Sequence, residues 1–245
     1  MFSSTTEDFI TTPLSELLVE ATDAMTAVED GMKGYQIADW VMPTLFLRMT
    51  GAQEQKLKCI HWDLGSVDLD QRYRYYSNKM GEMSCYDDKS KVCGEMLNFI
   101  VCNKQDFNPQ ADINRQKLLE EAKEDVKRIC GNSVMRAWYA ADYNGFEEVV
   151  ATFKYQDLVV WDEKKKKCTA LLGGELRSAF DALYNHRNKC AHNSTSYQMN
   201  LSKFQVLSGP YAKYENYFIR FFLLIMLDRL FVLLYQKAVA LADLN

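Results

Sequence analysis

The sequence predicts a mostly α-helical bundle with one short β-hairpin. Apolar residues recur three and four positions apart over most of the chain, the spacing that places side chains on one face of a helix. Residues 158–161 and 168–172 are short apolar segments joined by a polar tip, the pattern of a hairpin. Of the 245 residues, 48% are hydrophobic, a fraction that excludes wholesale disorder and can form a sizeable core.

The first quarter of the chain predicts consecutive helical segments. Pro13 suits the first turn of a helix, with Thr12 as its cap. A second helix covers residues 35–47, with a kink or a restart at Pro43. Gly51 interrupts the pattern, and helical spacing then resumes.

The middle of the chain is less regular. Residues 72–76 read Arg-Tyr-Arg-Tyr-Tyr, which can stack on RNA bases or, alternatively, cover a helix face with arginine stems. Residues 112–130 predict a strongly charged amphipathic helix. The lysines at 164–167 occupy the hairpin tip, where they are either simply solvated or contact phosphate. We interpret residues 63–170 as an insertion or subdomain of unknown role within a single domain over residues 1–245.

Residues 211–244 predict one long C-terminal helix that is apolar almost throughout. Its length would suffice to span a membrane. However, Arg220, Asp228 and Arg229 lie within it, and charges near the centre of a bilayer are costly. We therefore expect no membrane contact and a helix buried on nearly all sides, either in its own chain or shared with a second subunit.

Net charge and cysteine usage narrow the class of protein. The net charge of −4 argues against a broadly basic nucleic-acid surface, so any RNA contact must be local. The seven cysteines are an odd number without regular spacing, and residues 1–12 lack the basic start and apolar centre of a secretory leader. We expect reduced thiols in a cytoplasmic protein.

Residues 185–193, Asn-His-Arg-Asn-Lys-Cys-Ala-His-Asn, concentrate the side chains best suited to chemistry. Arg187 continues an apolar helical stripe from residues 176–183, although a buried guanidinium is costly unless it is paired or faces a site. Arg187 and His192 are five residues apart, roughly 140° around an ideal helix. They converge on one ligand only if the helix ends there or if two copies meet.

This run resembles the Arg-polar-x-x-x-His signature of the HEPN superfamily, all-helical domains of which many are ribonucleases. Arg187 matches the family arginine, Asn188 the polar residue after it and His192 the histidine. The resemblance covers residues 175–241, and residues 34–62 are similar, more weakly, to the paired helices that open such domains. It implies a homodimer that brings two motifs together, in a toxin or an antiviral defence effector. An antitoxin or a nucleotidyltransferase would be a further partner.

The resemblance also assigns a reaction. RNA carries its own nucleophile, the 2′-hydroxyl, so such an enzyme needs neither a metal nor another cofactor. His192 would move protons, because a histidine titrates near neutral pH. Arg187 would stabilise the charge that develops on the phosphate, and Asn188 would orient the phosphate or the histidine. The products would be a 2′,3′-cyclic phosphate and a 5′-hydroxyl.

Metal and thiol chemistry compete with this interpretation. His186 and Cys190 are four residues apart, which suits zinc bound on a helix together with His192. A fourth ligand would have to come from Cys168 or His61. Cys190 with a neighbouring histidine can also form a nucleophilic pair, although no third orienting group is evident.

The alternative from another class is a catalytically inactive helical dimerisation or adaptor module. In that module Arg187 pairs with a buried acid, such as Asp181 or Asp228. His192 then interacts only with the negative end of its own helix.

Overall fold

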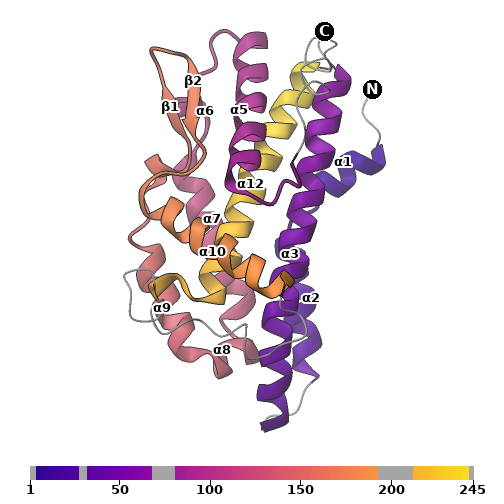
Figure 1. The fold of residues 1–245 in the computed structure, drawn as a ribbon, viewed down its shortest axis with the longest axis vertical. Coiled ribbons are helices and arrows are strands. Elements are labelled where there is room, and N and C mark those ends of the chain that lie inside the picture. Colours follow the sequence, from indigo (N-terminus) through magenta and orange to yellow (C-terminus); the bar gives the residue numbers. More distant parts are fainter. Residues whose placement is uncertain (1–3, 28–31, 68–80, 193–211, 243–245) are drawn as a thin grey trace.

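The computed structural model describes residues 4–27, 32–67, 81–192 and 212–242, and it confirms a mostly helical fold with a short hairpin (Figure 1). The helices are α1 (Ser4–Thr11), α2 (Ser15–Thr26), α3 (Met32–Val67), α5 (Tyr86–Asn103), α6 (Pro109–Asp112), α7 (Arg115–Cys130), α8 (Val134–Trp138), α9 (Ala140–Val150), α10 (Gly174–His192) and α12 (Tyr217–Ala242). Short 3-10 turns, η1 and η3, lie at Tyr155–Asp157 and Ala212–Tyr214. The mixed Arg-Tyr segment at 72–76 falls outside the described residues.

Helix α12 forms the centre of the molecule. Every residue from Phe218 to Asp228 is buried, and α3, α5, α7, α9 and α10 all pack against it (Figure 1). The prediction of a helix buried on nearly all sides is therefore confirmed, and the covering helices come from the same chain. None of the helices in the described residues combines the length and the apolar content needed to cross a membrane.

Helix α3 runs unbroken through Pro43 and Gly51, so the predicted restart at Pro43 and the interruption at Gly51 are wrong. A proline removes one backbone hydrogen bond and an interior glycine costs about 1 kcal/mol. Burial of Met42 and Phe46 on either side of Pro43 outweighs these local costs, because both side chains lie in the core. The result is one long helix on which α10 and α12 both pack.

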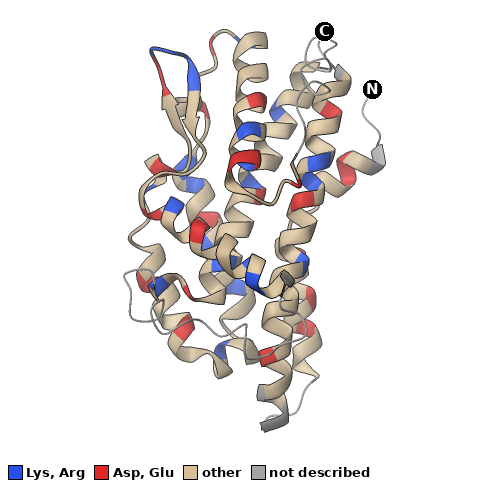
Figure 2. Cartoon of the chain, viewed as in Figure 1, with Lys and Arg blue, Asp and Glu red and all other residues tan. Residues whose placement is uncertain are grey.

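The hairpin forms as predicted, with slightly different strand limits. Strand β1 (Val160–Asp162) pairs antiparallel with β2 (Lys167–Ala170). Lysines 164–166 between the strands and Lys167 at the start of β2 place positive charge at the tip, at the edge of the helical body (Figure 2). Strand β2 packs against α5, and the chain leads from β2 directly into α10.

Helices from residues 63–170 contribute to the same core as the rest of the chain. Helices α5, α7 and α9 contact α12, and their buried side chains belong to one continuous apolar cluster with those of α3 and α10. Their interpretation as an insertion with its own role stays a prediction. Their structural consequence for the site is specific, since the first turn of α5 lies against α3 and Lys89 there contacts Gln53.

Candidate functional site

Helix α10 carries the motif, and a glycine sets where it begins. Gly174 has φ +48°, and a Cβ there would lie 2.6 Å from Asp157 Oδ2. Only glycine fits this approach without strain. From there the side chains of Leu176, Phe180 and Leu183 are buried in the core, as the apolar stripe predicts.

Arg187 lies at the edge of that stripe, paired but still partly exposed. Its Nη2 is 3.1 Å from both carboxylate oxygens of Glu54 on α3, and its side chain is 25% exposed. Its Nη1 donates to Asn188 Oδ1 at 3.4 Å. The guanidinium is thus held in one orientation by a carboxylate behind it, with part of its surface left to solvent.

The partner of Arg187 differs from the acids named in the alternative interpretation. Asp181 accepts from Arg177 at 3.0 Å, one turn away on the same helix. Asp228 is 2.8 Å from Lys56 Nζ in the core between α3 and α12. Each of these acids therefore already has its own cation, and the carboxylate that pairs with Arg187 is that of Glu54.

A buried lysine lies behind the Arg187–Glu54 pair. Lys89, in the first turn of α5, is only 4% exposed, and its Nζ donates to Gln53 Oε1 at 2.9 Å. Gln53 in turn donates to the carbonyl of Leu224 at 3.1 Å. Burial lowers the pKa of Lys89 to about 8, and nearby Glu54 partly opposes that shift while Arg187 adds to it. We call Gln53, Glu54, Lys89, Arg187 and Asn188 the Arg187 cluster.

A second ion pair marks the exposed rim of the Arg187 cluster. Lys58 Nζ lies 2.9 Å from Glu82 Oε2. The pKa of Glu82 is lowered, first by the hydrogen bond from Lys58, with Arg187 contributing from a greater distance. Three cations (Lys58, Lys89 and Arg187) and two carboxylates (Glu54 and Glu82) therefore lie at this end of α10.

Sequence reasoning missed Glu54 and Lys89. Glu54 falls inside the segment that resembles the family's opening helices, and that resemblance was the one available signal. Lys89 had none, because it follows Asp87 and Asp88 in a stretch that is typical of a solvated surface.

His192 is the last residue of α10, and its side chain lies outside the part of the chain that the structure describes. Its backbone position nevertheless sets one constraint. Five residues of helix separate it from Arg187, a rise of about 7.5 Å along the axis. Asn188, one residue beyond Arg187, is partly buried and already contacts the guanidinium.

The other face of the motif carries His186 and Cys190, which are both buried. His186 Nε2 is 3.0 Å from Tyr217 Oη and 3.4 Å from Cys190 Sγ, and its ring packs on Phe46. Burial, with Arg220 and Lys189 nearby, lowers the pKa of His186 to about 3, so its ring is neutral at pH 7. Burial likewise raises the pKa of the Cys190 thiol. A buried, protonated thiol is a poor nucleophile, so the thiol interpretation gains no support.

The zinc interpretation also lacks its extra ligands. Cys168 lies with the buried Cys93, and His61 Nδ1 is 3.2 Å from Glu95, both away from His186. Among the side chains that the structure describes, which do not include that of His192, no group of three or more His, Cys, Asp or Glu residues is arranged to hold a metal.

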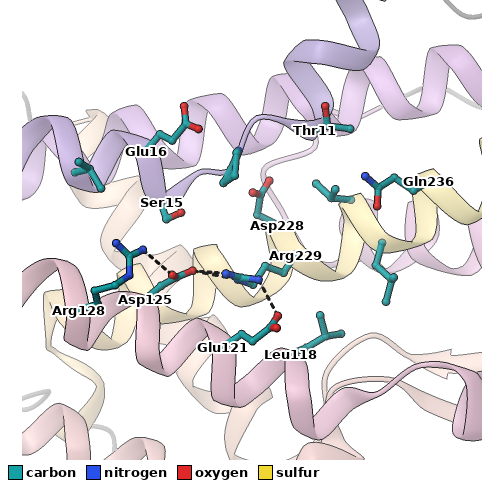
Figure 3. Close-up of a pocket in the computed structure, with 14 residues that line it drawn as sticks. Thr11, Ser15, Glu16, Leu118, Glu121, Asp125, Arg128, Asp228, Arg229 and Gln236 are labelled. Atoms are coloured by element: carbon teal, nitrogen blue, oxygen red, sulfur yellow. Dashed lines mark hydrogen bonds and ion pairs between the residues drawn. The ribbon is translucent and has the colours of Figure 1, made fainter.

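A groove of about 510 Å³ lies elsewhere, between the α1–α2 turn, α7 and α12. Figure 3 shows Asp125 between two arginines, with Arg229 at 2.5 Å and Arg128 at 2.9 Å, while Glu121 accepts from Arg229 at 2.8 Å. Both arginines are thus neutralised by acids of α7. No lining residue comes from α10, so the groove is separate from the motif.

Comparison of the chain with protein-family models, with curated proteins and with solved structures found no match in any of the three. Only the geometry of the Arg187 cluster and the residues of the motif therefore bear on what the chain does.

Proposed function

We propose that this protein is a metal-independent endoribonuclease of the HEPN type, which cleaves RNA through the 2′-hydroxyl. The observation that supports it best is the orientation of Arg187. A guanidinium held from behind by Glu54, partly exposed, and five residues before the histidine that ends α10 has the position needed to bind a phosphate.

In this mechanism each motif residue has one task. Arg187 binds two non-bridging oxygens of the scissile phosphate and stabilises the charge that grows on them. His192 removes the proton of the 2′-hydroxyl or returns one to the 5′-oxygen that leaves. Asn188 keeps the guanidinium in place. The bond from phosphorus to the 5′-oxygen breaks as the bond to the 2′-oxygen forms, giving a 2′,3′-cyclic phosphate and a 5′-hydroxyl.

The biological setting belongs to the same proposal. The enzyme acts in the cytoplasm as a homodimer with RNA as its substrate. An antitoxin or a nucleotidyltransferase restrains it, and its role is that of a toxin or an antiviral defence effector. The proposal involves no membrane.

The test is RNA cleavage by the purified protein in the presence of EDTA. Wild type should cleave and leave new 5′-hydroxyl ends, which polynucleotide kinase can label. Arg187→Ala should lose activity. Arg177→Ala, which removes an arginine of the same helix that is paired to Asp181, should keep it. Activity that disappears in EDTA and returns with zinc would overturn the proposal in favour of a metal site.

A second candidate, the inactive dimerisation or adaptor module, is favoured by one observation. The Arg187–Glu54 ion pair also joins α10 to α3, which is a structural task that needs no catalysis. The same experiment separates the two candidates. For an adaptor, Arg187→Ala lowers the melting temperature, and neither protein cleaves RNA.

A further inference from the structure

Lys89 occupies an unusual place for a lysine. The structure buries its ammonium against α3, where it donates a hydrogen bond to a neutral amide oxygen, that of Gln53. Gln53 is itself buried and anchored to the backbone of α12. Burying a cation costs free energy that one hydrogen bond to a neutral amide repays only in part, so stability alone is a weak reason for a lysine here.

Glu54 interacts electrostatically with two cations, Arg187 and Lys89. It contacts Arg187 directly at 3.1 Å, and its charge also acts on Lys89 through space. The carboxylate can compensate only one of them. With Lys89 protonated, the Arg187 cluster carries a net charge of +1, and the exposed part of that charge is the Arg187 guanidinium.

One further carboxylate, that of Asp88, acts on Lys89 from the start of its own helix and lies outside the Arg187 cluster. Asp88 accepts a hydrogen bond from the backbone of Met83 at 3.1 Å and lies close against Gly81. Cys85, just before α5, is a thiol. The groups that act on Lys89 are therefore Glu54 from α3, Arg187 from α10, and Asp88 and Cys85 from the start of α5.

We propose that Lys89 is a positioning residue of the Arg187 cluster, whose buried charge shares Glu54 with Arg187 and thereby strengthens the binding of a phosphodiester by the guanidinium. This inference rests on the proposed function, because it needs Arg187 to bind phosphate. The inference goes beyond the proposed function because it makes anion binding depend on the protonation of Lys89, a residue that the substrate does not touch.

A dependence on pH follows. Burial puts the pKa of Lys89 at about 8. Between pH 7 and pH 9.5 Lys89 loses its proton, the net charge of the cluster falls from +1 to zero, and a bound phosphate is held less tightly. Reciprocally, phosphate binding raises the pKa of Lys89, so binding near pH 8 takes up protons.

Binding can be measured without cleavage, using an RNA oligonucleotide that carries 2′-O-methyl groups throughout and so lacks the nucleophile. Fluorescence anisotropy at constant ionic strength gives Kd from pH 6.5 to 9.5. For wild type we expect Kd to rise about tenfold between pH 7 and pH 9.5, the size expected for one unit charge several ångströms away. Lys89→Met should bind at pH 7 as wild type does at pH 9.5, without further pH dependence in this range. Lys91→Met, which removes an exposed lysine of the same helix, should behave as wild type.

Wild-type protein supplies a measurement that does not depend on a variant folding. Isothermal titration calorimetry of the same oligonucleotide at pH 8, in two buffers of different ionisation enthalpy, should show net proton uptake. No uptake, or a folded Lys89→Met that keeps the wild-type Kd and pH profile, overturns the role of Lys89. Arg187→Ala distinguishes this from failure of the proposed function. If it binds as tightly as wild type, the Arg187 cluster is not the RNA site and both proposals fall.

Discussion

Neighbouring side chains of α10 have opposite tasks, and the difference lies in what surrounds each. Arg187 faces a carboxylate and solvent and keeps its charge, whereas His186 faces Tyr217, Cys190 and Phe46 and loses it. The helical step of about 100° per residue separates the two environments. His186, which lies 3.4 Å from the Cys190 sulfur and could be taken for a reactive group, is therefore a core residue.

Because His186 is neutral in the folded protein, the free energy of unfolding should depend on pH. Its pKa is about 3 in the folded protein and about 6.5 when unfolded, so the unfolded state binds more protons between these values. The stability from the neutral ring is complete above pH 6.5 and is lost as pH falls toward 3. Between pH 7 and pH 5 this group should account for about 2 kcal/mol of lost unfolding free energy.

Urea unfolding of wild type and of His186→Phe at both pH values measures this contribution, because phenylalanine fills the site and cannot titrate. The loss between pH 7 and pH 5 should be about 2 kcal/mol smaller in the variant. Equal losses in both proteins would show that another group causes the acid sensitivity.

His192 should be required for cleavage and not for folding. His192→Ala is expected to lower the cleavage rate at least about a hundredfold, since it removes the group that moves the proton. Its melting temperature should remain that of wild type. Asn185→Ala, at an exposed position of the same helix, is the matched control and should keep full activity. A dead Asn185→Ala would indicate that the whole end of α10, and not the histidine, is needed.

At the scale of elements, a buried ion pair joins three parts of the chain. Lys56 of α3 is 2.8 Å from Asp228 of α12 and also donates to the carbonyl of Thr12. The backbone N–H of Leu14 donates to the same carboxylate at 2.9 Å. Burial raises the pKa of Asp228 while Lys56 opposes that shift. The α1–α2 turn is thereby fixed to the central helix.

Breaking that pair should be costly, whereas removing it as a unit should not. Lys56→Met leaves a buried carboxylate without its cation and should lower the unfolding free energy by about 3–5 kcal/mol. Adding Asp228→Asn, which keeps an oxygen for Leu14, should restore more than half of the loss. Arg48→Met removes an ion pair between α3 and Glu20 of α2, whose partners are 60% and 58% exposed, and it should cost less than about 1 kcal/mol.

Denaturant unfolding of the single and double variants gives these values directly. If Lys56→Met unfolds no more easily than Arg48→Met, the Lys56–Asp228 pair does not hold the N-terminal helices, and packing alone must do so.

For the whole molecule, the buried first half of α12 is covered by helices of the same chain. The dimer that we propose would therefore form through other surfaces. Pairing two copies beside the end of α10 would instead bring two arginines and two histidines around one cleft. The value of dimerisation is then catalytic, because Arg187 and His192 diverge on a single helix.

A mixed dimer tests this arrangement. A chain with Arg187→Ala and a chain with His192→Ala together keep one arginine and one histidine. Co-expressed with different tags and purified as a heterodimer, they should cleave RNA measurably better than either mutant homodimer and less well than wild type. No recovery would mean that each protomer holds its own complete site or that both copies are needed. A strictly monomeric protein by light scattering would remove the composite site altogether.

The sequence by itself determined the helical class, the hairpin, the buried C-terminal helix and the place of Arg187 at the end of an apolar stripe. These features follow from periodicity and turn chemistry, which are local properties that neighbouring residues carry. Pro43 shows the limit of local reasoning, since burial of its flanks kept α3 continuous despite a strong helix breaker.

Only the tertiary structure decided what surrounds the motif. Glu54 is 133 residues from Arg187 in the chain, and Lys89 comes from a third helix with no sequence signal of burial. Ion pairs between helices depend on how distant segments pack, and no spacing within one helix reports it. For the same reason, the neutral state of His186 became evident only once Phe46 and Tyr217 were placed around it.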